Sequence, residues 1–263
     1  MNRRSFIGGA VFCGLLMMCL SGGRGVAAVP EGAEFYELRV YSTQSEAQQG
    51  LINDYWAKAA VPAYERMGVG PIGVFTELED SPTNRVFVLI PFAGAGDYAA
   101  VPGRLAADAK YVEAAAPYLD APRSDAAYTR YESSLLVAFE GMKRLEVPPS
   151  AVEKKPWVFE LRIYESHSEA KGENKVKMFN SGEIPLMKEV GLAPVFFGQT
   201  VVGSAMPNLI YMVSGEDTEA HKVHWKAFFD APVWKELIGD PQYKGNVSKV
   251  VSIFLKRTKA SQI

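Results

Sequence analysis

The sequence FYELRVY, from Phe35 to Tyr41, recurs 123 residues later as VFELRIY, from Val158 to Tyr164. Glu, Leu, Arg and Tyr are identical in the two stretches, and the other positions differ by close substitutions. In both, charged or hydroxyl-bearing side chains occupy every second residue. This alternation is typical of a β-strand with one apolar and one polar face. A chain that contains the same strand twice is typical of an internal duplication.

The same spacing continues beyond this strand. VPAYERMGVGPIGVF, starting at Val61, aligns with IPLMKEVGLAPVFFG, starting at Ile184, and RVFVLIPF from Arg85 aligns with NLIYMVSG from Asn208. In the second copy, periodicity and turn residues predict a helix that ends at Gly191 and is interrupted at Pro185. The full prediction for this copy is strands at 158–164, 195–202, 209–213 and 247–255, with helices at 175–190 and 220–238. The order β-α-β-β-α-β predicts an α+β protein of two tandem ferredoxin-like units.

These patterns divide the chain into four segments. Residues 1–28 are expected to be a signal peptide, 33–139 a first and more divergent domain, 140–156 a linker, and 157–257 a second domain. The linker is charged and contains a proline pair, which is typical of a connection between folded units.

The first 28 residues have the layout of an export signal. Arg3 and Arg4 precede a mostly apolar stretch at 6–20 and a small-residue tail that ends at Ala28. The stretch is too short for a lasting membrane span, so we expect export to the periplasm and no stable span after cleavage. The pair of arginines is typical of a twin-arginine signal, but Sec export stays an alternative.

Cleavage after Ala28 would remove Cys13 and Cys19, the only cysteines of the chain. The mature protein could then hold no disulfide, zinc–thiolate site or cysteine nucleophile. Its charge would be 25 basic against 30 acidic residues, because three arginines lie in the signal. No basic stripe forms, so nucleic acid is not an expected partner.

The alternation in the repeated strand sorts its residues onto two faces. One face of each copy carries no charge, and we expect it to pack against the helices; its residues are Tyr36, Leu38 and Val40 in one copy and Phe159, Leu161 and Ile163 in the other. The opposite faces carry Glu37, Arg39 and Tyr41, and Glu160, Arg162 and Tyr164. If the two sheets close face to face, both charged rows enter one shared interior. There the rows either form ion pairs of purely structural value or bind a small ligand, with arginine holding an anionic or carbonyl group.

Three stretches of the second copy carry a family resemblance. FELRIYES, IPLMKEVGLAPV and HWKAFFDAPVWKEL together resemble the NIPSNAP family, whose domains resemble the dimeric α/β-barrel superfamily. The resemblance implies ferredoxin-like halves that pair into a barrel, here within one chain. It implies no particular reaction, because related barrels include cofactor-free monooxygenases, isomerases and haem enzymes.

The helix around HKVHW differs most between the copies. His221 and Trp225 are four residues apart on one helix face, and His224 lies next to that face. The 123-residue offset places Tyr98, Val101 and Pro102 at these positions in the first copy. His221 and His224 are therefore candidates for acid–base catalysis. No carboxylate motif completes a metal site, and no phosphate or dinucleotide motif is present, so we expect neither metal nor cofactor.

Two functions remain open at this point. The first is an exported binding or interaction module that holds a small ligand in a tandem α/β barrel. The alternative is a small-molecule enzyme of the barrel type, a cofactor-free monooxygenase or isomerase. We favour binding because the copies agree on framework residues and differ at the histidines. Whether the chain also forms a homo-oligomer stays open.

Overall fold

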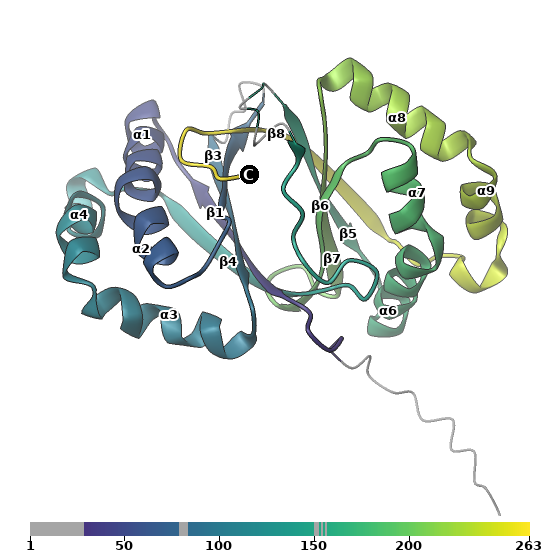
Figure 1. Ribbon diagram of the computed structural model, residues 1–263, viewed down its shortest axis with the longest axis horizontal. Helices are drawn as coiled ribbons and strands as arrows, with labels where there is room; N and C mark the ends of the chain where they lie inside the picture. The colour runs from purple at the N-terminus through teal and green to yellow at the C-terminus, as the bar shows by residue number, and fades with distance from the viewer. Residues whose placement is uncertain (1–28, 79–83, 150–152, 154, 156) are drawn as a thin grey trace, which may run out of the picture.

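The computed structural model describes residues 29–78, 84–149, 153, 155 and 157–263 of the chain (Figure 1). The expected signal peptide lies outside the described residues. The first repeat contains β1 (Phe35–Ser42), α1 (Glu46–Tyr55), η1 (Trp56–Ala60), α2 (Val61–Arg66), β2 (Gly73–Glu77), β3 (Arg85–Phe92), α3 (Ala95–Ala107), α4 (Ala109–Leu119), η2 (Arg123–Asp125) and β4 (Arg130–Ala138). The second contains β5 (Val158–Glu165), α6 (Glu169–Met178), η3 (Phe179–Glu183), α7 (Ile184–Glu189), β6 (Pro194–Val202), β7 (Asn208–Gly215), α8 (Thr218–Asp230), α9 (Pro232–Gly239), η4 (Pro241–Tyr243) and β8 (Lys249–Arg257). Both repeats therefore have the predicted β-α-β-β-α-β order.

The strands close into one antiparallel barrel in the order β1-β3-β2-β8-β5-β7-β6-β4. Each repeat supplies half of the barrel, and the halves join where β2 pairs with β8 and where β4 pairs with β6. The helices of the two repeats lie on opposite sides of this barrel (Figure 1). The predicted intramolecular α/β barrel is confirmed.

The interior of the barrel is apolar. Its buried residues come from the strands of both repeats and include Tyr36, Leu38, Phe75, Phe87, Leu89, Leu136, Phe159, Leu161, Phe196, Ile210, Met212 and Leu255. The rings of Phe75 and Phe159 meet across the two repeats, with centroids 4.8 Å apart. Our prediction that Leu38 and Leu161 pack against the helices is therefore wrong.

The charged rows point the other way. Tyr41 belongs to the cluster beneath the helices of the first repeat, and Tyr164 packs against the corresponding cluster of the second. The two Glu-Arg-Tyr rows consequently lie on opposite outer faces of the barrel and do not share an enclosure. The physical reason is that a barrel filled by apolar side chains offers no partners for charges, whereas a helix layer supplies hydroxyl, imidazole and indole groups.

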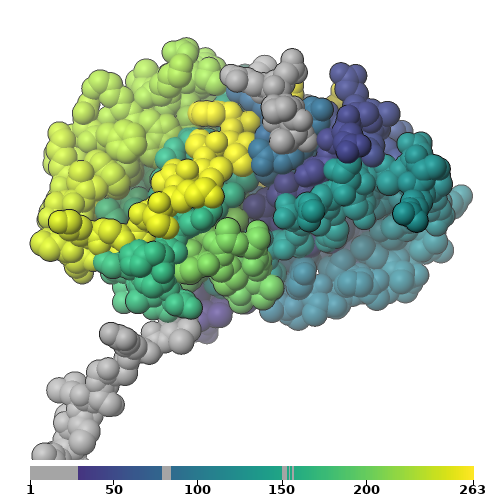
Figure 2. Space-filling model, turned by 180° about the vertical axis from the view of Figure 1, so that it is seen from behind, coloured from purple at the N-terminus to yellow at the C-terminus, as the bar shows by residue number. Residues whose placement is uncertain are grey.

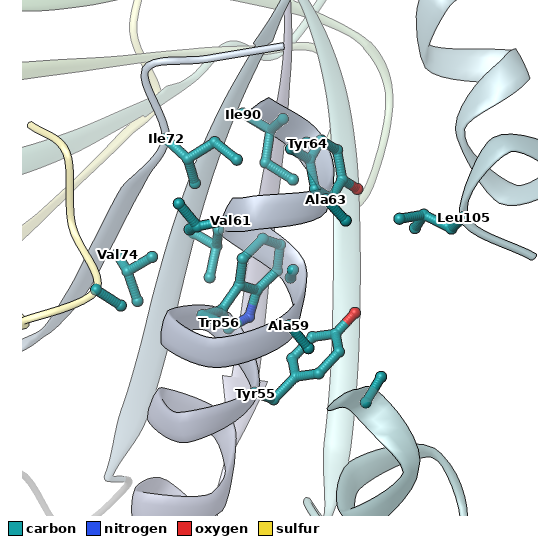
Figure 3. Packing of buried hydrophobic residues seen from close by; sticks show 14 of the residues in the cluster. Tyr55, Trp56, Ala59, Val61, Ala63, Tyr64, Ile72, Val74, Ile90 and Leu105 are labelled. Atoms are coloured by element: carbon teal, nitrogen blue, oxygen red, sulfur yellow. The ribbon is translucent and has the colours of Figure 1, made fainter. Parts of the chain in front are cut away.

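The helix layer of each repeat contains one π-helical turn. It occupies Trp56–Ala60 in the first repeat and Phe179–Glu183 in the second, directly before a helix whose first turn contains proline. Proline cannot donate the helical hydrogen bond and its ring crowds the carbonyl four residues earlier, so a widened turn accommodates it. The predicted interruption at Pro185 is thus confirmed. Figure 3 shows Trp56 and Tyr64 packing from these helices toward the strands of the first repeat.

The segment after β8 returns to the first repeat. The backbone N–H of Ile72 donates to Oε1 of Gln262 at 2.7 Å, and the backbone N–H of Gln262 donates to the carbonyl of Ile72 at 2.8 Å. Ile263 is fully buried among the residues of the barrel interior. Residues 249–263 thus complete the barrel and then anchor on the other half of the molecule. Among the described helices, none combines the length and the hydropathy of a transmembrane segment.

Candidate functional site

The outer face of β5 lies beneath α8 in the second repeat. β5 is an inner strand of its half-barrel, and its register places Tyr211 of β7 and Ser252 of β8 on either side of Arg162. α8 begins at an Asp217 cap, whose carboxylate accepts hydrogen bonds from the first backbone N–H groups of the helix. The cap fixes the start of α8 and so brings His221 over β5.

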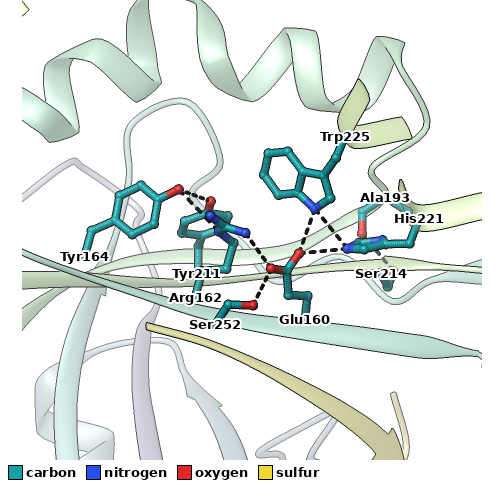
Figure 4. Close-up of polar contacts among 9 residues, drawn as sticks. All are labelled: Glu160, Arg162, Tyr164, Ala193, Tyr211, Ser214, His221, Trp225 and Ser252. Carbon is teal, nitrogen blue, oxygen red and sulfur yellow. Dashed lines mark hydrogen bonds and ion pairs between the residues drawn. The ribbon is translucent and has the colours of Figure 1, made fainter. Parts of the chain in front are cut away.

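Glu160 is the centre of the polar network beneath α8 (Figure 4). Its side chain is 3% exposed, and both of its oxygens accept hydrogen bonds. Arg162 Nη1 and the Ser252 hydroxyl donate to Oε1. His221 Nε2 lies 2.8 Å from Oε2, and the Trp225 indole N–H donates to Oε2 at 2.7 Å. A buried carboxylate with four donors is well satisfied.

These donors determine the charge of Glu160. Burial alone raises the pKa of Glu160, but the hydrogen bond from His221, the charge of Arg162 and the hydrogen bonds from Ser252 and Trp225 lower it to about 2. Glu160 is therefore ionised at neutral pH. An ionised carboxylate only accepts hydrogen bonds, so the contact with His221 is donated by its Nε2.

This low pKa predicts a stability difference in acid. The folded-state pKa of Glu160 lies below its value of 4.5 in the unfolded chain, so its contribution is present above pH 4.5 and is lost as the pH falls toward 2. We expect the free energy of unfolding of the native protein to fall by roughly 3 kcal/mol more than that of Glu160→Gln across this window. Urea titrations at a series of pH values measure both curves. Parallel curves would contradict the assignment.

Arg39, the equivalent arginine of the first repeat, forms two hydrogen bonds with Glu37 of the same strand. Its Nε donates to Glu37 Oε1 at 2.6 Å and its Nη2 to Oε2 at 2.9 Å, a two-bond fork. Nη2 also donates to the hydroxyl of Tyr64, and Ser133 donates to Glu37 as Ser252 does to Glu160. The Glu-Arg-Ser arrangement is thus common to both repeats.

Arg162 is held differently. His221 and Trp225 occupy Oε2 of Glu160, so Arg162 reaches Glu160 through Nη1 alone. Its Nε donates to the hydroxyl of Tyr164 at 3.3 Å, and its guanidinium lies 4.6 Å from the ring centroid of Trp225. Among the described residues, no group accepts a hydrogen bond from Nη2, and the side chain keeps 17% exposure. Arg39 likewise has no described acceptor for Nη1, but the indole beside it, Trp56, is fully buried. The second repeat therefore differs in placing its arginine next to a half-buried ring, Trp225.

A second buried ion pair lies beside this network. Lys175 of α6 and Glu183 of η3 form an ion pair with side chains 5% and 2% exposed. The Lys175 ammonium lies near the rings of Phe179, Tyr164 and Trp234, 4.7 to 5.7 Å from their centroids. Burial raises the pKa of Glu183, and the charge and hydrogen bond of Lys175 counteract this effect.

The rings of both candidate histidines pack against a glycine. His221 is 1% exposed, and a Cβ built on Gly215 would stand 3.2 Å from its Nδ1. His224 does not join the Glu160 network; a Cβ on Gly191 would stand 3.0 Å from its Nε2, and its Nδ1 is buried without a partner. Within the described ranges, no three His, Cys, Asp or Glu side chains are grouped to hold a metal ion.

The predicted site residues thus form two separate groups rather than one. Glu37, Arg39 and Tyr41 lie under the first helix layer, where Tyr41 packs against other tyrosines. Glu160, Arg162 and Tyr164 lie under the second and are joined there by His221. Sequence reasoning missed the Lys175–Glu183 pair, the packing of Tyr211 and the role of Ser252. The 123-residue offset could have found the pair, because it places apolar Ile52 and Ala60 at those positions.

Comparison with solved structures agrees with the barrel. A putative monooxygenase from Fusobacterium nucleatum matches with a TM-score of 0.55 and 10% identity, over 88% of this chain and 94% of that one. A putative monooxygenase from Lactobacillus acidophilus matches with a TM-score of 0.54 and 13% identity, over 88% and 97%. A NIPSNAP-like domain protein from Burkholderia xenovorans matches with a TM-score of 0.35 and 16% identity, over 39% and 86%. At these identities the first two likenesses concern the fold alone. No curated protein sequence matches the chain.

The fold and the two matched segments define the class of protein: a tandem α/β barrel built from two ferredoxin-like repeats. The NIPSNAP family model matches residues 36–136 and again residues 159–262. The chain therefore belongs to the NIPSNAP family, with one NIPSNAP domain in each repeat.

Proposed function

We propose that this chain is an exported small-ligand-binding protein whose site lies on the outer face of β5, beneath α8. The observation that carries the proposal is Nη2 of Arg162, which has no acceptor among the described residues and belongs to a guanidinium lying against the half-buried ring of Trp225. A guanidinium with an unused donor at a partly exposed position is suited to a ligand oxygen. In the first repeat, Glu37 accepts from Nε and Nη2 of Arg39, and the indole beside Arg39, Trp56, is fully buried.

The charge balance of the site favours a neutral ligand. Arg162 is already paired with Glu160, and Lys175 with Glu183, so the buried charges cancel. An anion would add an uncompensated negative charge to a region of low dielectric, whereas a carbonyl oxygen only accepts a hydrogen bond. We therefore expect a ligand with a carbonyl group.

The apolar surroundings favour a flat ligand body. Trp225 is half-buried and stacks on Phe229, which is 48% exposed. On the strand side, Phe254 of β8 is 37% exposed, and Ser252 beside it is exposed as well. β8 lies at the surface of the molecule next to α8, without a helix over it (Figure 2). Rings at such an edge can contact a planar molecule while Arg162 holds its oxygen.

The geometry gives less support to the enzyme alternative. A general base must reach the proton that it abstracts, directly or through one water. Nδ1 of His221 lies next to Gly215, the ring of His224 lies next to Gly191, and Nδ1 of both rings is buried, so neither imidazole is directed to the partly exposed side of Arg162. Binding needs only the donor and the rings, which are present.

The test compares two matched arginine variants. The mature protein is purified, denatured, and the small molecules that it releases are identified by untargeted mass spectrometry. We expect Arg162→Met to retain at least about tenfold less ligand per folded protein than the native chain, because hydrogen bonds to charged groups contribute about 1.5–3 kcal/mol. Arg39→Met removes the equivalent arginine of the first repeat and should retain the ligand.

Both variants lose one half-buried arginine, so a general loss of stability affects them alike and is measured by melting. Equal retention by the two variants would contradict the proposed site. If the native protein releases no small molecule with a carbonyl group, the proposed ligand class is wrong.

A further inference from the structure

A cavity lies at one end of the barrel, on the opposite face of the sheet from Arg162. It has a volume of about 170 Å³ and is lined by both repeats. Leu38 and Phe87 contribute walls from the first repeat, and Leu161, Ile163 and Ile253 from the second. Because Leu161 and Ile163 alternate with Arg162 along β5, no ligand can occupy both places at once.

The cavity is large enough for a ring. A closed cavity of about 150 Å³ with apolar walls accommodates benzene, so this volume suits a body of similar size. The buried strand residues that line the cavity are apolar except for Asn208, whereas Ser204 and Ala205 of the hairpin between β6 and β7 are exposed at its outer rim. A ligand would therefore place an apolar body inward and a polar group outward.

The charges at the rim favour a cation. Arg85 forms an ion pair with Glu77, and Glu165 forms one with Lys249, so these four side chains balance. Glu132 of β4 also lines the cavity, and no described residue forms an ion pair or hydrogen bond with it. The rim thus retains one carboxylate beside an apolar space.

We propose that this cavity binds a small primary amine with an apolar body the size of a benzene ring, and that Glu132 is its counter-ion. The apolar body replaces water in the barrel end, and the ammonium group lies at the rim beside the carboxylate. This inference does not rest on the function proposed for Arg162, because it concerns a different face of the sheet and a different ligand chemistry.

Three probes of equal size test the charge preference. Benzylamine, benzyl alcohol and benzoate are titrated into the full mature chain, and binding is followed by protein-observed NMR. We expect benzylamine to bind up to about fivefold more tightly than benzyl alcohol, the range of a partly exposed ion pair, and benzoate to bind most weakly. Equal or tighter binding of benzoate, or no binding of any probe at millimolar concentration, would overturn the proposal.

Three variants locate the binding. Glu132→Gln should remove the preference for benzylamine over benzyl alcohol, whereas Glu113→Gln, an exposed carboxylate of α4, should leave it unchanged. Val40→Phe places a ring in the cavity and should abolish binding of all three probes; persistent binding overturns the location. Arg162→Met should leave benzylamine binding intact, so failure at one site is distinguishable from failure at the other.

Discussion

Lys175→Ile is expected to destabilise the protein by about 3–5 kcal/mol, because it leaves Glu183 buried without its partner. The isoleucine itself fits, since the first repeat has buried Ile52 at the equivalent position. The double variant Lys175→Ile, Glu183→Ala reproduces the Ile52 and Ala60 of that repeat and should recover most of the loss. Urea denaturation of the single and double variants measures both effects.

The pH dependence of Lys175→Ile provides a second readout. Burial already raises the pKa of Glu183, and removal of Lys175 eliminates the influences that lower it. A carboxyl group with a raised folded-state pKa contributes stability below its unfolded pKa and loses it as the pH rises through the folded value. The free energy of unfolding of Lys175→Ile should therefore be close to that of the native protein in mild acid and lower than it at neutral pH. A double variant no more stable than the single one would show that the pair is not the cause.

Phe159→Ala is expected to destabilise the barrel by about 3–5 kcal/mol, because it opens a cavity in an interior built by both repeats. The Phe159 ring is fully buried and meets Phe75 of the other repeat. Phe229→Ala, at a half-exposed ring of α8, is the control and should have a much smaller effect.

A double-mutant cycle tests the contact itself. If Phe75 and Phe159 pack together, the combined loss should differ from the sum of the single losses by about 0.5–3 kcal/mol. Denaturant unfolding of the native chain, both single variants and the double variant provides the four values. Strict additivity would contradict a contact between the repeats at this point.

Much of the fold could be predicted from the sequence because the patterns that indicate strands, helices and turns occur in both repeats. The order of elements and the interruption at Pro185 are encoded in local patterns, whereas the closure of two halves into a barrel was expected from the family resemblance. Which face of each strand lies in the barrel and which lies under the helices could not be predicted in the same way. Alternation shows that Glu160 and Arg162 share a face, but not whether helices or the opposite half-barrel cover it.

The candidate site was accordingly predicted only in part. Glu160, Arg162 and His221 were all identified from the sequence, yet their contact depends on the covering of β5 by α8, which no local pattern encodes. Lys175 was missed because a lysine next to apolar helix positions resembles a solvated residue. Its burial follows from Glu183, eight residues later, which supplies the counter-charge.

The closure of the barrel by residues 249–263 has a consequence for folding during synthesis. β2 gains its outer partner only when β8 arrives, so the first repeat presents an unpaired strand edge to the surrounding solution until then. Nascent chains released before that point would expose this edge and the apolar lining of a half-open barrel. We expect such fragments to bind chaperones or to aggregate with one another, even though each contains a whole domain.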